Sequence, residues 1–279
     1  MIRIHKTIAI PLILTTDGDK QTNALNKNYS DNPDHYISAA GVKIKSLTPM
    51  EFDNSIYGDS TVKDLLIADQ HEKCCFCESK FLETSYGDVE HFRPKRAYQK
   101  LNSKKLNYPG YYWLTYNWNN LMFSCEKCNR SYKRNQFPLE TETTRKISHD
   151  HANLLENEDR LLIDPNFEDP SVYITFLNES PSAIKANLKG EKTIEAFNLK
   201  RLNSTRLDYI KTLKLALTWS KINLGSDEEI ELAMQTFKFT RDEVIEFVTE
   251  GIDLYNSVAK DTAKFAHCVR ANFPDLPTA

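Results

Sequence analysis

Five of the six cysteines in this 279-residue chain fall into two tight clusters, and no other feature of the sequence constrains its fold as strongly. The first cluster, CCFC, contains Cys74, Cys75 and Cys77, and the second, CEKC, contains Cys125 and Cys128. A secreted disulfide framework would spread its cysteines more evenly, whereas paired CxxC turns are typical of metal sites. Because each CxxC turn brings two thiolates to one point, the two turns predict a tetrahedral four-sulfur zinc site.

The spacing within the clusters favours one set of ligands. Cys74 with Cys77, and Cys125 with Cys128, have the CxxC spacing. Only one residue separates Cys75 from Cys77, which makes a poorer turn, so we favour Cys74 as the ligand and keep Cys75 as the alternative. Four thiolates leave no open coordination position, so this zinc is expected to hold the fold and to take no part in chemistry.

Length and composition are those of an ordinary globular protein. Hydrophobic residues make up 40% of the chain and charged residues 27%, and the length suffices for one large domain or two smaller ones. The apolar run IAIPLIL, residues 8–14, is too short to span a bilayer, contains a proline and is followed by no small-residue cleavage site. We therefore expect a cytoplasmic protein without a membrane partner, in which this run is extended and packs on the core.

Basic residues concentrate in one part of an otherwise acidic chain. Between Arg93 and Arg134 there are ten lysines and arginines and a single acid, Glu126, so this window carries +9 and the rest of the chain −12. A basic patch on an acidic body can hold phosphates at one place without coating nucleic acid everywhere. A solvated lysine-rich loop is the alternative, and it is the better interpretation of residues 95–105 taken alone.

The hydrophobic pattern predicts an α+β fold in three parts. Residues 1–58 form an irregular N-terminal segment, with one or two short elements, that packs on the core or on a partner. Residues 59–160 form the core with the zinc site, in which a helix leads into the first cysteine cluster, a short strand pair surrounds GDVEHF, and a helix begins near Cys128. Residues 161–279 form a connection and a mainly helical C-terminal subdomain.

The segment between and just after the cysteine turns contains four polar residues whose order is informative. Glu90 and His91 are adjacent, Asn120 precedes a leucine, and Asn129 follows the second turn directly. This order resembles the HNH, or ββα-metal, endonucleases, in which a zinc site staples a hairpin to a helix. The resemblance implies that His91 is the general base, that Asn120 holds the hairpin loop and orients His91, and that Glu90 and Asn129 bind a catalytic metal ion.

The residue types suit phosphodiester hydrolysis. This reaction needs a base to deprotonate water and a cation to stabilise charge on the phosphate, and a neutral imidazole suits the first task. Carboxylate and amide oxygens are ligands for Mg²⁺ or Mn²⁺. Many HNH enzymes have aspartate before the histidine, and Glu90 is one methylene longer, so Asp88 is the alternative carboxylate ligand.

Several basic side chains adjoin this set and are assigned to phosphate contacts by position alone. They are Arg93, Lys95, Arg96, Arg130 and Lys133.

The motifs around this core point to a narrower family. The fragments CCFCESKF, GDVEHFRPKRAY, YYWLTYNWNNLMFSCEKCNRSYKRNQFPL and LLIDPNFEDP, with the opening MIRIHK, resemble the HNH nuclease subunits of the Septu antiphage system, including retron-associated versions. They run through residues 1–170, and TIEAFNLKRLNSTR extends the resemblance weakly to about residue 206. The resemblance implies antiphage defence together with an ABC-type ATPase partner.

Three functions remain open from the sequence. The first is a divalent-metal-dependent endonuclease that hydrolyses phosphodiester bonds of nucleic acid, with the choice between DNA and RNA left open. The second is an RNA nuclease of the same system, acting for example on tRNA. The third is a zinc-stapled nucleic-acid-binding adaptor without catalysis, whose helical C-terminal part recruits the partner.

Overall fold

Small two-stranded sheets and mostly short helices surround the cysteine clusters in the computed structural model, which describes residues 1–38 and 49–278. The helices are α1 (Leu12–Thr15), α2 (Asp17–Asp31), α3 (Asn54–Tyr57), α4 (Ser60–Asp69), α5 (Leu188–Ala196), α6 (Asn203–Trp219), α7 (Asp227–Phe237), α8 (Arg241–Ser257) and α9 (Ala266–Asn272). The strands are β1 (Asp88–His91), β2 (Tyr98–Gln99), β3 (Leu106–Asn107), β4 (Leu121–Ser124), β5 (Ile174–Leu177) and β6 (Ser180–Ala183). This arrangement confirms the predicted α+β class.

The hairpin that carries His91 is formed by strands distant in sequence. Strand β1 pairs antiparallel with β4, with Glu90 opposite Met122 and His91 opposite Leu121. A π-helix, η5 (Lys127–Lys133), follows β4 and contains Cys128, the last residue of the second CxxC turn. The predicted strand at GDVEHF and the predicted helix near Cys128 are thus both present, but the partner of the strand is β4, beyond the aromatic block, and not a neighbouring segment. The helix is wound more widely than an α-helix.

The aromatic block before β4 provides most of the hydrophobic support for this hairpin. Its large side chains are at most 5% exposed, and they pack into the main core cluster together with all four cysteines of the CxxC turns. The block consists of Tyr111, Tyr112, Trp113, Tyr116, Trp118 and Phe123. Large aromatics beside a small metal site bury the apolar area that such a short sheet cannot supply.

The N-terminal part is more regular than its sequence predicts. Helix α2 has 15 residues, although residues 1–58 were expected to be irregular with only short elements. The helix is strongly polar and buries only a narrow stripe, in which Leu25 and Tyr29 are one turn apart and Tyr29 stacks on Tyr112 at 5.1 Å. So narrow a stripe gives a weak periodic signal, which is why the helix was missed.

The apolar run of residues 8–14 does not pack on the core as an extended segment. Ile8 is 97% exposed and Leu12 is 73% exposed, and the run ends inside the short helix α1, where Leu14 is buried. Polar contacts instead attach the preceding residues, since the Lys6 ammonium group donates to the backbone carbonyls of Trp118 and Leu121.

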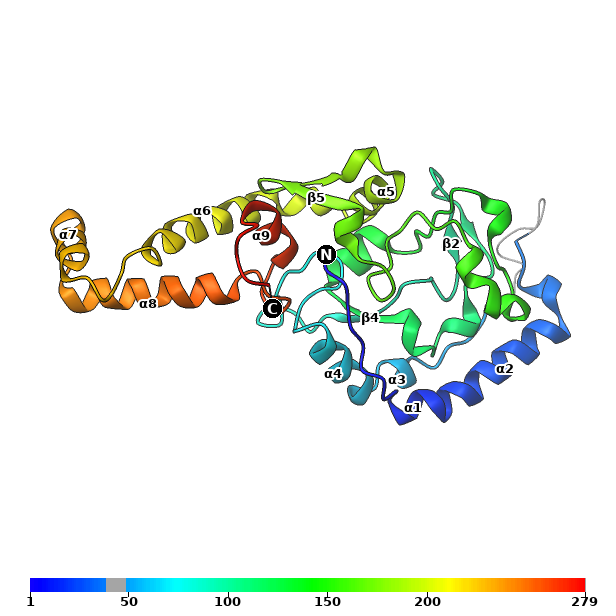
Figure 1. Cartoon of the computed structure of the whole chain (residues 1–279). Helices are drawn as coiled ribbons and strands as arrows, with labels where there is room; N and C mark the ends of the chain where they lie inside the picture. Colours follow the sequence, from blue (N-terminus) through cyan, green and yellow to red (C-terminus); the bar gives the residue numbers. More distant parts are fainter. Residues whose placement is uncertain (39–48, 279) are drawn as a thin grey trace.

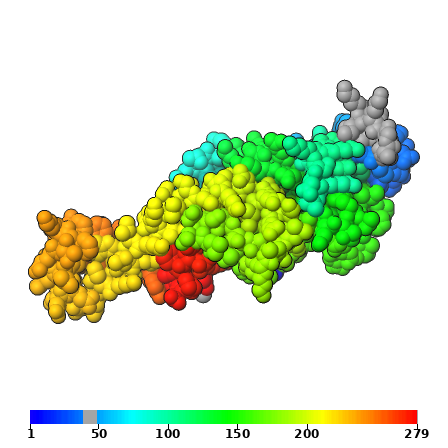
Figure 2. Space-filling model, turned by 90° about the horizontal axis from the view of Figure 1, so that it is seen from above, coloured from blue at the N-terminus to red at the C-terminus, as the bar shows by residue number. Residues whose placement is uncertain are grey.

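The C-terminal part is helical, as predicted, and much of it projects from the body as a narrow arm (Figures 1 and 2). Helices α6 and α8 run side by side, with Gly251 of α8 so close to the α6 backbone at Ala216 that a methyl group would not fit. Helix α7 caps the far end of the arm, where Ile230 and Val244 belong to a separate small hydrophobic cluster. We call residues 203–257 the arm.

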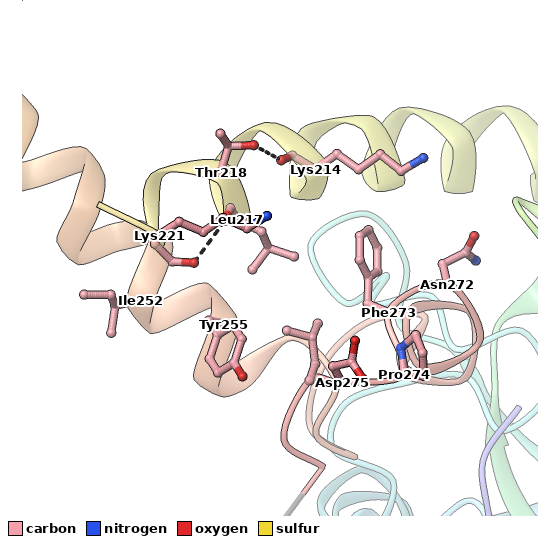
Figure 3. A pocket seen from close by; sticks show the side chains of 12 residues that line it. Lys214, Leu217, Thr218, Lys221, Ile252, Tyr255, Asn272, Phe273, Pro274 and Asp275 are labelled. Carbon is pink, nitrogen blue, oxygen red and sulfur yellow. Dashed lines mark hydrogen bonds between the residues drawn. The ribbon is translucent and has the colours of Figure 1, made fainter. Parts of the chain in front are cut away.

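The arm is anchored to the body on both sides. Phe197, just before the arm, stacks on Phe76 of the first cysteine cluster at 3.8 Å. Helix α9, just after the arm, packs against β5. A groove of about 490 Å³ lies between α6, α8 and the C-terminal segment, and its apolar lining includes Leu217, Tyr255 and Phe273 (Figure 3). No helix within residues 1–38 and 49–278 is long and apolar enough to cross a membrane.

Candidate metal centre and active site

The two CxxC turns meet in the body and form a four-sulfur cluster. The Sγ atoms of Cys74, Cys77, Cys125 and Cys128 all lie within 4.8 Å of one another, and all four side chains are buried. Cys75 is outside this group. The predicted four-cysteine cluster is therefore confirmed. Of the adjacent cysteines Cys74 and Cys75, the cluster contains Cys74.

The chemistry of this cluster fits zinc. Cys77 Sγ and Cys125 Sγ are 3.9 Å apart, close to the separation of about 3.8 Å that tetrahedral Zn–S bonds of roughly 2.3 Å require. Burial raises the pKa of the Cys128 thiol well above its usual value. A buried set of four thiolates would need a cation among them, and a bound zinc ion would supply the charge that deprotonates the thiols.

Each of the four sulfurs also has a polar neighbour other than a sulfur. The contacts are Ser124 Oγ to Cys74 Sγ at 3.6 Å, Ser79 Oγ to Cys77 Sγ at 3.4 Å, the Cys128 backbone N–H to Cys125 Sγ at 3.5 Å, and Arg201 Nη2 to Cys128 Sγ at 3.2 Å. Arg201 is the cation of this set, and its guanidinium group also lies over the Tyr132 ring at 5.0 Å. Such partners orient metal ligands and offset their charge.

His91 lies at the end of β1 with its ring fixed by one hydrogen bond. Its Nε2 is 2.9 Å from the backbone carbonyl oxygen of Thr115. A carbonyl can only accept, so Nε2 carries the proton and Nδ1 keeps its lone pair. Burial, followed by the Lys95 charge, lowers the pKa of His91 well below its usual value. The imidazole is therefore neutral near pH 7.

Asn120 binds the loop that follows His91. Its Oδ1 accepts the backbone N–H of Arg93 at 2.8 Å, and its Nδ2 donates to the carbonyls of Arg93 and Leu114, each at 3.1 Å. The side chain is buried. It joins the loop after His91 to the segment whose next residue, Thr115, holds the His91 ring.

Two carboxylates on β1 have different surroundings. Asp88 accepts from the Arg130 guanidinium group, with Nε at 2.8 Å, and from Asn129 Nδ2 at 3.1 Å. Glu90 is buried, and its Oε1 lies 2.5 Å from the Lys133 ammonium nitrogen without the angle of a hydrogen bond. Burial raises the pKa of Glu90, and Lys133 opposes this effect.

Two of the five expected phosphate contacts are directed into the protein. Arg93 is buried, and its Nε donates to Glu158 at 3.0 Å. Lys133 is fully buried, and its Nζ donates to the His91 carbonyl at 2.9 Å in addition to its pairing with Glu90. Their assignment to phosphate contacts is corrected, because both cations neutralise buried acids and cannot reach a ligand at the surface.

The remaining predicted residues gather in one cleft of about 420 Å³. Most of the assigned side chains line it, whereas Asn120 lines a different cavity. The predicted residues in the cleft are Asp88, Glu90, His91, Lys95, Arg96, Asn129 and Arg130. The structure thus brings a neutral imidazole, two carboxylates, an amide and several cations to one surface.

Comparison with known proteins identifies the family. A curated relative named Septu protein PtuB, from Bacillus mycoides (strain KBAB4), is 34% identical to this chain over 240 residues, which cover 80% of each protein. The chain belongs to the Septu PtuB family. A second Septu protein PtuB, from Bacillus thuringiensis, is 29% identical over 161 residues, which cover 57% of this chain and 48% of that protein. No family model matches the chain, and no solved structure matches it.

Membership of the PtuB family confirms the resemblance to a Septu system component that the motifs predict. Three further residues of the cleft were not predicted from this PtuB-family sequence. Tyr57 packs edge-on against the His91 ring at 4.7 Å, and Lys63 and Arg134 line the cleft. Tyr57 and Lys63 precede the first cysteine turn and belong to no motif, so only the fold reveals them. Arg134 lies within the basic window, which was a usable signal.

Proposed function

We propose that this chain is a divalent-metal-dependent HNH endonuclease that hydrolyses phosphodiester bonds of nucleic acid. The observation that carries the proposal is the state of His91, a neutral imidazole whose Nε2 proton is held by the Thr115 carbonyl, in a cleft that also contains carboxylates, Asn129 and several lysines and arginines. A histidine with a fixed proton on one nitrogen and a free lone pair on the other suits a general base.

In this proposal His91 Nδ1 takes a proton from the attacking water. Asn120 is a positioning residue, because it holds both the loop after His91 and the segment that carries the Thr115 carbonyl. It does not line the cleft and so would not touch the substrate. Its loss would let the imidazole rotate away from the phosphate, which is costly because proton transfer requires contact distance.

Glu90 and Asn129 are the proposed ligands of the catalytic Mg²⁺ or Mn²⁺. Glu90 Oε1 is a buried oxygen that accepts no hydrogen bond of regular geometry among the described residues, and its only close cation is the Lys133 ammonium group at 2.5 Å, so it would bind the metal ion beside Lys133. Asp88 already accepts hydrogen bonds from Arg130 and Asn129, so we give it the role of orienting Asn129. The Asn129 Nδ2 contact with Asp88 leaves Asn129 Oδ1 for the metal. The bound ion would stabilise the charge of the phosphate and of the leaving oxygen.

The test compares the intact chain with His91→Ala, with and without a candidate ATPase, on plasmid DNA and on total tRNA with Mg²⁺ or Mn²⁺. His151→Ala is the matched control, because His151 is exposed and outside the cleft. We expect cleavage to be lost in the first variant and kept in the second. Cleavage that survives His91→Ala in an active preparation would show the assignment to be wrong.

The same experiment distinguishes a DNA substrate from an RNA substrate. The aromatic block, which could have stacked on unpaired bases, is buried and is used for packing. It therefore no longer favours an RNA substrate. Salt-sensitive binding without cleavage of either substrate would favour the non-catalytic adaptor instead.

We further propose that the chain acts in antiphage defence with an ABC-type ATPase partner, as its family resemblance implies, and that the arm contributes to that association. The arm carries its own small hydrophobic cluster at its far end, so this end can be removed while the body keeps its core. Replacing residues 219–248 by a short glycine-serine turn should abolish co-purification with the ATPase. Undiminished co-purification would assign docking to the body.

A further inference from the structure

A second groove adjoins the cleft that contains His91. Its volume is about 850 Å³, and it lies between the β2–β3 loop (residues 100–105), the end of η5 and helix α5. Arg134 lines both hollows, and it directly follows η5 with a backbone φ of 51°. The two hollows therefore meet at Arg134. We call the second one the Arg134 groove.

The two hollows together carry a strong local positive charge. Their lining contains eight lysines and arginines and three acids, so the lining carries +5 although the whole chain carries −3. The cations are Lys63, Lys95, Arg96, Lys100, Lys104, Arg130, Arg134 and Lys192, and the acids are Asp88, Glu90 and Glu195. A cationic hollow on an acidic protein concentrates anions at one place.

Many of these cations are not used by the fold. Arg130 pairs with Asp88, Lys192 with Glu195, and Lys100 lies 3.8 Å from Glu142. The other five have no carboxylate within 4.0 Å in the part of the chain that the structure describes. These five are Lys63, Lys95, Arg96, Lys104 and Arg134. Lys95 is half-buried and its ammonium group already donates to the Tyr57 hydroxyl, whereas the other four remain available to a ligand.

The placement of the five cations suggests a path. Lys63, Lys95 and Arg96 line the cleft, Arg134 lies at its junction with the groove, and Lys104 lies in the groove beyond. A path of cations that starts beside a candidate hydrolytic base matches a polyanion that extends past the reacting phosphate, not a small anion.

We propose that the Arg134 groove binds the sugar-phosphate backbone of the nucleic-acid substrate as it leaves the cleft. This inference rests on the proposed nuclease function and extends it to residues outside the HNH motif. Backbone contacts of this kind position a strand without reading its sequence. The groove would therefore contribute to affinity and to the salt dependence of binding, and not to base preference.

The test measures binding alone, in the His91→Ala background so that no substrate is consumed. The probes are fluorescein-labelled 20-nucleotide single-stranded DNA, single-stranded RNA and duplex DNA, titrated with the full chain by anisotropy between 0.05 and 0.2 M salt. The variants are Lys104→Glu and Arg134→Gln, singly and together. The matched control is Lys105→Glu, an exposed neighbour of Lys104 that does not line the groove.

We expect the double variant to bind about tenfold or more weakly, and the slope of log K against log salt to fall by roughly 1 for each lost phosphate contact. Lys105→Glu should have much less effect. The three probes show which form of nucleic acid uses the groove.

Unchanged binding of every probe by the double variant would overturn the proposal, as would an equal loss in Lys105→Glu. Binding of poly-glutamate in place of all three probes would assign the groove to an acidic protein partner and would also overturn it. These outcomes are separate from the failure of the nuclease function, which is read from cleavage by the chain with an intact His91. A chain that cleaves normally but does not need the groove refutes this inference alone.

Discussion

Replacement of Arg201 by glutamine should weaken zinc binding by the four-cysteine cluster. Arg201 Nη2 lies 3.2 Å from Cys128 Sγ, and its Nη1 donates to the Phe197 carbonyl at 2.7 Å. Glutamine removes the positive charge next to the cluster and cannot bind the Cys128 sulfur and the Phe197 carbonyl at the same time. Because four thiolates around Zn²⁺ leave two net negative charges in a buried place, the loss of the neighbouring cation raises the free energy of the zinc-bound form.

Two estimates of the effect agree in order of magnitude. A unit charge pair at this separation gains about 5 kcal/mol at an effective dielectric constant near 20, before the desolvation of both groups is subtracted. A hydrogen bond to a charged group contributes a net ~1.5–3 kcal/mol. The second range corresponds to roughly a 10- to 100-fold change in zinc affinity, which is also the usual effect of losing an outer partner of a metal ligand.

The measurement is competition for zinc with a chromophoric chelator, followed at equilibrium on the folded chain. Lys200→Gln is the matched control, because it removes the same charge from the same short helix (Leu199–Leu202) and its side chain is exposed. We expect Lys200→Gln to bind zinc like the wild type. If Arg201→Gln has the wild-type zinc affinity while its far-UV circular dichroism is unchanged, Arg201 does not support the metal site.

Three further predictions concern individual residues. Cys74→Ser should release zinc and unfold the body, whereas Cys75→Ser should retain one zinc ion per chain by atomic absorption, because Cys75 is outside the sulfur cluster; equal zinc contents would contradict this ligand set. Gly110→Ala should lower the free energy of unfolding by about 1–3 kcal/mol in urea, because a methyl group would lie 2.4 Å from the Pro94 carbonyl oxygen; an unchanged midpoint would show that the loop yields. Burial raises the pKa of Asp164 to about 6, so the folded chain holds this proton more tightly than the unfolded chain does, and the associated stability is lost as the pH rises from about 4 through 6. Asp164→Asn should therefore be more stable than the wild type at pH 8, by at most about 3 kcal/mol, and equally stable at pH 4; a difference that does not change with pH would refute this.

The sequence predicted the parts of the fold that depend on local chemistry. The CxxC turns specify the sulfur cluster by spacing alone, and the hydrophobic pattern placed a strand at GDVEHF, where β1 lies, although its pairing with β4 was not predicted. Helix α2 was missed because its buried stripe is narrow and the rest of it is polar. The prediction that residues 8–14 are extended and packed on the core was wrong. An apolar segment need not be buried when polar contacts attach the neighbouring residues to the body.

The candidate site shows a similar limit for charged residues. Arg93 and Lys133 stand beside Lys95 and Arg134 in the same basic window, and the sequence gives no reason to treat them differently. The fold buries the first two against Glu158 and Glu90, whereas Lys95 is half-buried beside Tyr57 and Arg134 is exposed. Which cations serve the core depends on acids distant in sequence, and these are brought close only by tertiary structure.

The short helix η5 links the structural metal to the proposed chemistry. Cys128 belongs to the sulfur cluster, the next residue is the proposed ligand Asn129, and Lys133 at the end of the helix holds both Glu90 and the His91 carbonyl. These three residues all belong to the seven-residue helix η5. Because η5 is a π-helix, it is wound more widely than an α-helix and spaces the three side chains differently. Loss of zinc would release one end of η5 and, through Lys133, the strand that carries His91, the proposed base. A zinc ion with no open coordination position is thus expected to be essential for cleavage, because it fixes the helix on which the active site depends.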